Sequence, residues 1–365
     1  MRVLVTGATG FVGGRLVPAL LAAGHDVTAL VRDASRYDAP EGVRVVEGDL
    51  LDAGSFEAAL DVDAAYYLVH SMRAGADFEE RDRRAAENFA RAAAERGVDR
   101  VVYLGGLGED RDRLSEHLRS RREVERILGE GAYDLTTLRA AILIGDGSAS
   151  FEMIEQLSSR LPVMVTPRWV ETACQPIFVD DAVEYLVGVL DVPETAGETY
   201  EIGGPDVLSY REILRRVGEH RGRAPRIVPV PVLSPKLSSM WIGLVTDIPA
   251  SVARPLIEGL KNPVVVRDHR IESLVAVDLT PFDEAVSQAL GGDVATDGGG
   301  GRTGDARGGA GGDGGGVRYD GEGAGDEGGA HDPPTRGDGA ASSDDGVGAD
   351  TAGNARLTNA GSPDR

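Results

Sequence analysis

The stretch "RVLVTGATGFVGG", Arg2–Gly14, decides the fold of this protein. Its first five residues form a short apolar run typical of a buried strand, and three glycines follow at GxxGxxG spacing before a helical pattern. Gly7 permits a tight turn, Gly10 lets a pyrophosphate approach the backbone, and Gly13 lets the helix pack close on the strand. Because the loop joins a strand to a helix, it predicts a dinucleotide site, and the alternative is a turn with coincidental glycines. The expected cofactor contacts in this stretch are Gly7, Thr9, Gly10, Phe11, Val12 and Gly13.

The first 145 residues alternate between β-rich runs and helical segments. Apolar runs predict strands at residues 2–6, 26–32, 43–49, 64–69, 100–104 and 133–145. Helical spacing of apolar side chains predicts helices at residues 11–24, 77–97 and 114–131. Continuous apolar strands that alternate with helices are typical of a parallel sheet covered on both faces. We therefore predict an α/β fold, a Rossmann-type doubly wound parallel sheet, with its nucleotide-binding core at residues 1–145.

Beyond Gly145 the pattern is less regular and predicts a smaller C-terminal lobe. Helices are expected at residues 151–157, 180–190 and 210–221, and short strands near Val163, Ile177, Tyr200 and Ile227. Residues 146–292 are expected to complete the same domain as a lobe that binds substrate or a partner. Within this lobe, residues 231–260 are notably apolar. We expect them to cover a pocket or join the core, and a protein partner is an alternative occupant of that segment.

The end of the chain and the net charge limit the class of partner. Residues 293–365 are mostly Gly, Asp, Ala and Ser, too few large apolar side chains to offset chain entropy, so they predict a disordered acidic tail. The formal net charge is -22, and Lys is scarce beside Arg. This balance argues against nucleic acid or an anionic membrane as partner. It favours an acidic, halophilic protein that stays soluble at high salt, and an ordinary acidic cytosolic protein is the alternative.

Composition also disfavours several kinds of site and location. A single cysteine, Cys174, allows no disulfide within the chain, and we expect it to pack in the interior. The six histidines show no metal-ligand spacing, so no metal site is predicted. The first residues lack the features of a signal peptide, and no apolar run reaches about 18 residues. The expectation is a cytoplasmic protein without a membrane span.

The residues after the second predicted strand bear on which dinucleotide binds. A carboxylate at this place would hold the ribose 2′-hydroxyl of NAD, but the chain has Arg32, with Arg36 close behind. A guanidinium suits a 2′-phosphate, so NADP is predicted in preference to NAD. Asp33 could weaken this preference, and a solvated loop charge is the alternative for Arg32. Asp49, at the end of the third strand, could bind the adenine amino group or simply form a turn.

Further stretches resemble the short-chain dehydrogenase/reductase superfamily, in its extended and atypical NAD(P)-binding branches. They are "YYLVHSM" (66–72), "SEHLRSR" (115–121), "LRAAILIGDGSASFEM" (138–153), "PRWV" (167–170), "QPIFVDDAVEYLV" (175–187) and "YEIGGPDVLSYREIL" (200–214). The subgroup includes NmrA-like proteins, nucleoside-sugar-epimerase-like proteins and relatives of the NAD(P)H-binding accessory subunit of respiratory complex I. The resemblance covers about residues 1–290 and implies fold and cofactor. It does not imply one reaction, because the subgroup contains enzymes, sensors and structural subunits.

Carried over residue by residue, the resemblance implies an altered active site. Gly105 and Gly106 fall where active members carry a serine, and His117 and Arg121 fall where they carry tyrosine and lysine. Arg121 is implied to contact the ribose, as the lysine does. The remaining implied cofactor contacts are Gly7, Gly10, Gly13, Arg32, Asp49, Leu50, Leu68, Val69 and His70.

His117 and Arg121 lie one helical turn apart, so both could face the cofactor. Arg121 stays protonated and cannot relay protons. His117 titrates near neutral pH, and a neighbouring cation favours its neutral form, which is a weak acid. The pair could grip the cofactor, assist an altered reduction, or lie on the surface. We expect cofactor grip first and altered catalysis second.

The sequence favours an NADPH-dependent oxidoreductase that acts on a small carbonyl or quinone without the usual Ser-Tyr-Lys site. Arg168 and Trp169 are candidate substrate contacts, and a structural loop is an equal alternative. Tyr66, Tyr67 and Tyr103 are candidate proton donors, although packing residues are more common at such places. The alternatives are a non-catalytic redox sensor or assembly subunit that binds NAD(P)H, and a sugar-nucleotide epimerase.

Overall fold

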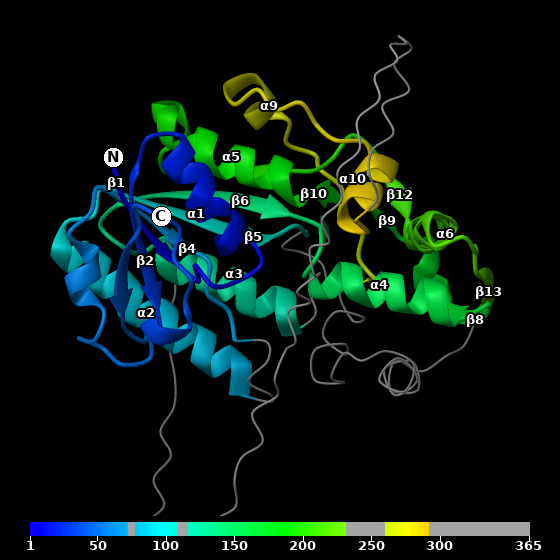
Figure 1. The fold of residues 1–365 in the computed structure, drawn as a ribbon, viewed down its shortest axis with the longest axis horizontal. Helices are drawn as coiled ribbons and strands as arrows, with labels where there is room; N and C mark the ends of the chain where they lie inside the picture. The colour runs from blue at the N-terminus through cyan, green and yellow to red at the C-terminus, as the bar shows by residue number, and fades with distance from the viewer. Residues whose placement is uncertain (72–76, 109–115, 231–259, 292–365) are drawn as a thin grey trace, which may run out of the picture. The chain divides into compact units, whose positions relative to one another are not determined.

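The computed structural model describes residues 1–71, 77–108, 116–230 and 260–291. Its centre is a sheet in the order β11-β6-β5-β4-β1-β2-β3, and every neighbouring pair in it is parallel (Figure 1). The strands are β1 (Arg2–Thr6), β2 (Asp26–Val31), β3 (Arg44–Glu47), β4 (Ala64–Tyr67), β5 (Arg100–Gly106), β6 (Asp134–Ala140) and β11 (Thr199–Ile202). The predicted Rossmann-type parallel sheet is confirmed.

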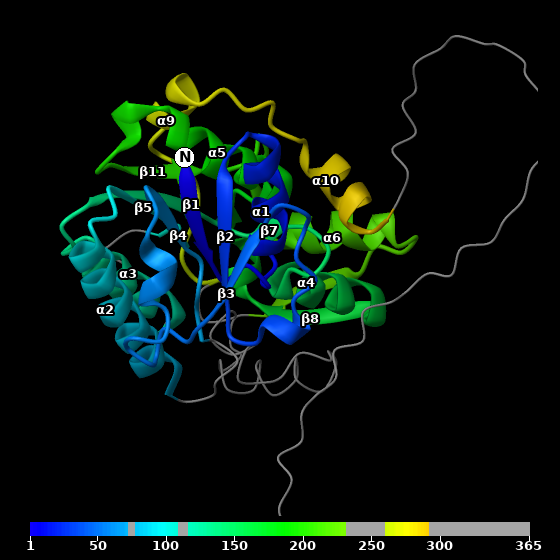
Figure 2. The same cartoon turned by 60° about the vertical axis from the view of Figure 1, so that its left-hand side comes forward.

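Helices cover both faces of this sheet. The two layers are α1 (Gly13–Ala22) with α5 (Val179–Asp191), and α2 (Phe78–Arg96) with α3 (Glu116–Leu128), and Figure 2 shows them from another side. Successive residues of a strand point to opposite faces. Val3 and Val5 of β1 accordingly pack in the layer of α1 and α5, whereas Leu4 packs in the layer of α2 and α3. The central stretches of β1, β2, β4 and β5 are therefore largely apolar, because both faces of the sheet are buried there.

The helix α2 shows how the sequence sets an element's bounds. Glu79 and Glu80 lie in its first turn, where carboxylates favour the positive end of the helix dipole. Its last residue precedes Gly97, which adopts the left-handed conformation (φ 69°) and ends the helix. The buried face includes Phe78, Ala85, Phe89 and Ala93, as the spacing predicted.

The sixth predicted strand, residues 133–145, is two strands in the structure. β6 stays in the main sheet, and β7 (Leu143–Ile144) leaves it to pair in parallel with β10 (Ile177–Phe178). The single-strand prediction was wrong because two consecutive buried strands read as one apolar run. The departure of β7 starts the C-terminal lobe.

The C-terminal lobe is built around its own apolar cluster, which includes Phe151, Val170 and Ile213. The strands expected near Val163, Ile177, Tyr200 and Ile227 are all present, and the edge strand β11 joins the main sheet. The other elements of this lobe are α4 (Ala149–Arg160), β8 (Val163–Pro167), η4 (Arg168–Glu171), β9 (Ala173–Cys174), β12 (Leu208–Ser209), α6 (Tyr210–His220), β13 (Arg226–Val230), α9 (Arg270–Leu274) and α10 (Phe282–Ala289).

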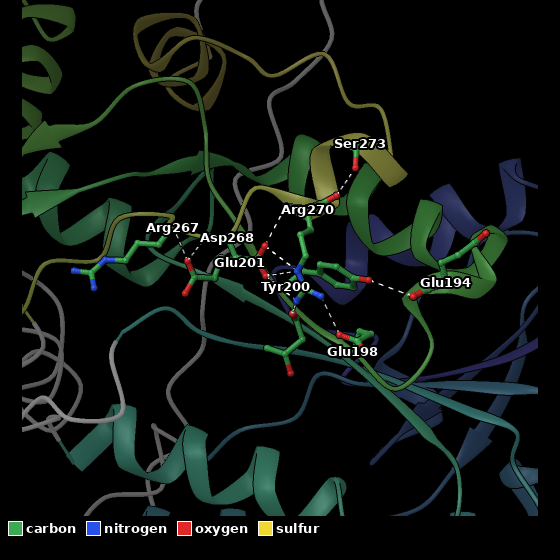
Figure 3. Close-up of polar contacts among 9 residues, drawn as sticks. Glu194, Glu198, Tyr200, Glu201, Arg267, Asp268, Arg270 and Ser273 are labelled. Carbon is green, nitrogen blue, oxygen red and sulfur yellow. Dashed lines mark hydrogen bonds and ion pairs between the residues drawn. The ribbon is translucent and has the colours of Figure 1, made fainter.

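A returning segment covers the edge strand β11. Figure 3 shows Arg270 lying over the ring of Tyr200, 5.0 Å from its centroid, while its Nη1 donates to Glu198 at 3.1 Å. The carboxylate of Glu201 accepts the backbone N–H groups of Arg267 and Asp268 at 2.6 and 3.2 Å. Arg270 also donates to the Thr199 carbonyl at 3.1 Å, which pairs one backbone acceptor of this edge strand. The predicted tail, 293–365, and nearly all of the apolar segment 231–260 lie outside the described residues.

Candidate functional site

The glycine loop has the tight geometry that its sequence predicts. Gly7 adopts φ +71°, and the Gly10 N–H donates to the Gly7 carbonyl at 2.9 Å to close the turn. A Cβ on Gly13 would lie 2.2 Å from the Gly7 carbonyl oxygen, so α1 can begin there only with glycine. Thr9 and Gly10 are exposed, which leaves their backbone open to an approaching pyrophosphate. The loop therefore fits a dinucleotide.

The loop lies at the point where the strand order reverses. β2 and β3 lie on one side of β1, while β4, β5, β6 and β11 follow on the other. The hydroxyl of Thr6 donates to the Tyr66 carbonyl at 2.9 Å and accepts the Leu68 N–H at 3.2 Å, which ties the ends of β1 and β4 together. A Cβ on Gly7 would lie 2.9 Å from the Leu68 carbonyl oxygen. Leu68 therefore borders the loop; Leu68 and Val69 are half-buried, and His70 is exposed.

A second wall of the glycine loop comes from residues far along the chain. The ring of Phe11 would be 3.1 Å from a Cβ on Gly145 and 3.6 Å from one on Gly147. Arg15 donates to the carbonyls of Phe11 and Asp146 at 2.9 and 2.8 Å, and its guanidinium lies 4.6 Å from the centroid of the Phe11 ring. The sequence carried no local sign of this link, because its two ends are more than a hundred residues apart.

The end of β2 leaves an arginine available to the adenosine half of a cofactor. Arg32 is exposed, and no hydrogen bond or ion pair joins it to another described residue. Asp33 turns toward its own backbone, where its Oδ1 accepts the N–H and hydroxyl of Ser35 at 3.0 and 2.6 Å. The hydrogen bond from the Ser35 side chain lowers the pKa of the Asp33 carboxyl. Asp33 is therefore engaged in capping η1 (Ala34–Arg36).

Asp49 has the turn-forming arrangement that the sequence left open. Its Oδ1 accepts the Leu51 N–H at 2.9 Å, and its own N–H donates to the Ser55 hydroxyl at 2.9 Å. Leu50 is buried, and its carbonyl accepts the amide of Asn88 at 2.8 Å. The loop after β3 is thereby fastened to α2.

The places of the usual catalytic residues hold no hydroxyl among the described side chains. Arg121, on α3, donates its Nη1 to the Leu104 carbonyl at 3.1 Å, so the end of β5 gives it a polar partner. A Cβ on Gly106 would lie 2.8 Å from Leu118 and 3.9 Å from Arg121. His117 belongs to α3, but its side chain lies outside the described residues. The structure thus places Gly106 beside Leu118 and Arg121 of α3.

The three candidate tyrosine donors are core residues. Tyr66, Tyr67 and Tyr103 are all buried, and burial raises the pKa of each phenol. The Tyr66 hydroxyl donates to the Leu186 carbonyl at 2.6 Å, and the Tyr103 hydroxyl donates to the Arg121 carbonyl at 3.2 Å. They do not reach a substrate in this arrangement.

Arg168 and Trp169, the candidate substrate contacts, differ in their exposure to solvent. Trp169 is half-buried and meets the ring of Tyr210 edge-on, with centroids 6.2 Å apart, whereas Arg168 is exposed on η4. This geometry favours a packing role for Trp169. The sequence also predicts Asp180 and Asp181 as N-terminal caps of a helix, because they stand just before its apolar pattern. This prediction was wrong: α5 begins at Val179, so both residues lie inside its first turn and Phe178 is the N-cap residue. Asp181 instead accepts the N–H and the hydroxyl of Thr280, both at 2.8 Å.

Cys174 packs in the interior, as predicted. It is fully buried, and burial raises the pKa of its thiol from an ordinary value of 9.0 to about 12. We expect no reaction with a thiol reagent at pH 8 in the native protein and one equivalent after denaturation, measured with Ellman's reagent. Because the unfolded thiol ionises first, the stability that it contributes is full below pH 9 and is lost as the pH rises toward 12. Rapid native labelling would contradict the buried placement.

One buried carboxylate near the loop was missed by sequence reasoning. Asp82 on α2 accepts the Ser71 N–H at 2.6 Å and the Ser120 hydroxyl at 3.1 Å. Burial raises the pKa of its carboxyl. The signal was present: Asp82 stands three residues before Ala85 and seven before Phe89, within the apolar stripe of the helix.

Within the described residues, no cluster of His, Cys, Asp and Glu is suited to a metal ion, and no helix is both long and apolar enough to cross a membrane.

Comparison with known proteins agrees with this geometry. Residues 7–166 match the family described as NAD(P)H-binding. The chain is 53% identical over 74 residues to a 3-diazoavenalumate denitrifying reductase of Streptomyces sp (20% of this chain, 24% of the relative). It is 26% identical over 242 residues to the mitochondrial NADH dehydrogenase [ubiquinone] 1 alpha subcomplex subunit 9 of Arabidopsis thaliana (62% and 60%). It is 27% identical over 253 residues to the chloroplastic divinyl chlorophyllide a 8-vinyl-reductase of Oryza sativa subsp. indica (63% and 61%). The chain thus spans about a quarter of the first relative and three fifths of the other two.

Solved structures show the same fold. A nucleoside-diphosphate-sugar epimerase from Staphylococcus aureus matches with a TM-score of 0.64 at 18% identity (78% of this chain, 99% of that one). The Citrobacter sp. triphenylmethane reductase in complex with NADP(H) matches with a TM-score of 0.64 at 20% identity (80% and 100%). Residues 7–166 of the chain therefore resemble an NAD(P)H-binding domain, and the fold is the one found in this epimerase and this reductase.

Proposed function

We propose that this protein is an NADPH-dependent reductase whose acceptor is a small quinone or carbonyl compound, with quinones favoured. The observation that carries the proposal is the pairing of an intact dinucleotide loop with an active-site helix that lacks tyrosine and lysine. Gly7, Gly10 and Gly13 form the cradle, while Gly106 and Arg121 stand at the positions where the resemblance implies a serine and a lysine. Bound NADPH would supply the hydride, and with a proton from water it would convert a quinone to the hydroquinone.

The chain's own residues suit an acceptor that needs no protein acid. An alkoxide that develops from an ordinary ketone needs a proton donor nearby. Arg121 does not give up its proton, and the phenols of Tyr67 and Tyr103 are buried with a raised pKa. A quinone is reduced to a weakly basic product that water can protonate. Arg121 would then hold the cofactor ribose or the acceptor oxygen by donating hydrogen bonds.

The choice of NADPH over NADH rests on Arg32. Its guanidinium is exposed and free of described partners, and Asp33 is occupied with Ser35. A 2′-phosphate placed at the end of β2 would meet a cation and no competing carboxylate. We further assign residues 146–292 to the acceptor side of the site, and a cytoplasmic location at high salt, on composition and sequence pattern.

The test is steady-state oxidation of NADPH by the full chain, followed at 340 nm with a set of simple quinones and ketones at high salt. Turnover with quinones that falls to the background rate in His117→Ala would support a reductase in which His117 assists. Turnover unchanged in that variant would support the reductase and remove His117 from it. Binding of NADPH without turnover on any acceptor would contradict the reductase. It would favour a cofactor-binding subunit or sensor, which the 26% identity to a complex I subunit makes the second candidate.

A further inference from the structure

Asp82 joins three elements through one buried carboxylate. The residue lies on α2 and is 5% exposed. Its Oδ1 accepts the backbone N–H of Ser71, at 2.6 Å, and its Oδ2 accepts the hydroxyl of Ser120 on α3, at 3.1 Å. A buried carboxylate is destabilising unless its oxygens accept hydrogen bonds. Asp82 therefore holds Ser71 and Ser120 in the positions from which they donate.

The hydrogen bond between Asp82 and Ser71, here called the first arm of Asp82, fixes the segment that borders the glycine loop. Residues 68–71 follow β4, and their first member is tied to β1 because the Leu68 N–H donates to Thr6 at 3.2 Å. Their last member, Ser71, is tied to Asp82. The segment is therefore held at both ends. The Leu68 carbonyl lies so close to Gly7 that a shift of this segment would displace the glycine loop.

The hydrogen bond between Asp82 and Ser120, the second arm of Asp82, fixes the helix that carries the altered active site. Ser120 directly precedes Arg121, whose guanidinium donates to the Leu104 carbonyl at 3.1 Å. The Tyr103 hydroxyl donates to the Arg121 carbonyl at 3.2 Å. α3 is thus fastened to α2 and to the end of β5 at the same turn. Asp82 sets the separation between this turn and residues 68–71.

Both hydrogen bonds of Asp82 lie on the side of β1 where the nicotinamide half of a bound dinucleotide is expected. In a doubly wound sheet the cofactor crosses the point where the strand order reverses, here between β1 and β4. The adenosine half belongs over β2, where Arg32 lies, and the nicotinamide half belongs over β4 and β5. We propose that Asp82 is a positioning residue for the nicotinamide half, and that it acts through hydrogen-bond geometry. The inference rests on the proposed cofactor site and adds a residue to it.

Two ligands and two substitutions at one position test this assignment. We would measure by calorimetry the affinity of the full chain for NADPH and for adenosine 2′,5′-bisphosphate, which lacks the nicotinamide half. Asp82→Ala is expected to weaken NADPH about 10-fold and to leave the bisphosphate unchanged. Asp82→Asn can still accept from Ser71 with its amide oxygen and donate to Ser120 with its amide nitrogen. It is expected to stay within about 2-fold of the wild type for both ligands.

Asp181 supplies a matched control. It is 4% exposed and also accepts one backbone N–H and one hydroxyl, both from Thr280. Asp181→Ala should lower the melting temperature as Asp82→Ala does, yet keep both affinities. If Asp82→Ala does not fold, Ser120→Ala removes only the second arm and should weaken NADPH alone, about 3-fold.

Three outcomes would overturn the inference. The first is an unchanged NADPH affinity in Asp82→Ala or, where that variant does not fold, in Ser120→Ala. The second is an equal loss of affinity for NADPH and the bisphosphate, and the third is an Asp82→Asn protein that binds NADPH as weakly as Asp82→Ala does. The Arg121 cation also interacts electrostatically with the Asp82 carboxylate. The last result would mean that Asp82 acts through this charge and not through hydrogen-bond geometry. The readout is binding, so its failure differs from failure of the proposed reaction. A wild type that binds NADPH but reduces no acceptor leaves the role of Asp82 intact.

Discussion

Gly13→Ala is expected to abolish detectable binding of NADPH. The new Cβ would lie 2.2 Å from the Gly7 carbonyl oxygen and 2.9 Å from the Ala8 Cα, and both are backbone atoms of the loop itself. Neither can yield without moving the start of α1. Loss of two hydrogen bonds from backbone N–H groups to the pyrophosphate, at about 1.5 kcal/mol each, corresponds to about 100-fold in affinity. Calorimetry on the folded protein measures this change.

Gly14→Ala is the matched control for this prediction. Gly14 is the next residue of the same helix and is exposed, and a Cβ on it would lie 3.9 Å from the Ala8 carbonyl oxygen, an ordinary van der Waals distance. Alanine favours a helix over glycine by up to about 1 kcal/mol, so the melting temperature should hold or rise. NADPH affinity should be unchanged. Equal binding by both variants would show that the loop does not carry the cofactor.

Arg32→Ala is expected to weaken NADPH binding about 10-fold and to leave NADH binding unchanged. An exposed guanidinium that contacts a 2′-phosphate contributes a charge-assisted pair, partly screened by water and salt. NADH has no 2′-phosphate, so the substitution removes no interaction with it and its affinity should not change. The difference should shrink as the salt concentration rises, because screening weakens the pair in the wild type. Titrations of both cofactors at two salt concentrations measure it.

Arg44→Ala controls for the loss of one positive charge in an acidic protein. Arg44 is also exposed, but it begins β3 and so lies at the amino end of the parallel strands, whereas the cofactor loop follows their carboxyl end. Its removal should alter neither affinity by more than about 2-fold. A preference for NADH in the wild type, or equal effects of the two substitutions, would contradict the assignment of Arg32 to the 2′-phosphate.

The sheet and the glycine loop could be predicted because their signals are local. A strand buried on both faces must be apolar throughout, and a turn that needs φ +71° at Gly7 needs glycine. The apolar stripe of α2 likewise follows from a period of 3.6 residues. The same local reasoning merged β6 with β7, because hydropathy does not say to which sheet an apolar residue belongs.

Other features needed the tertiary structure. Asp33 looked like a rival to Arg32 until its carboxylate proved to bind Ser35. Asp181 looked like a helix cap, but its partner is Thr280, 99 residues away. A side chain's hydrogen-bond partner depends on which segments the fold brings beside it, and spacing along the chain does not report that.

The sequence by itself thus determined a parallel α/β sheet with a dinucleotide loop, since both depend on residues within one strand, turn and helix. Only the tertiary structure decided what surrounds that loop. It placed Arg15 against Asp146, and Asp82 between Ser71 and Ser120. These hydrogen bonds join residues that are 11 to 131 positions apart in the sequence. The physical reason is that a hydrogen bond needs its two groups within about 3 Å, a condition set by packing of whole elements and not by either residue's neighbours in sequence.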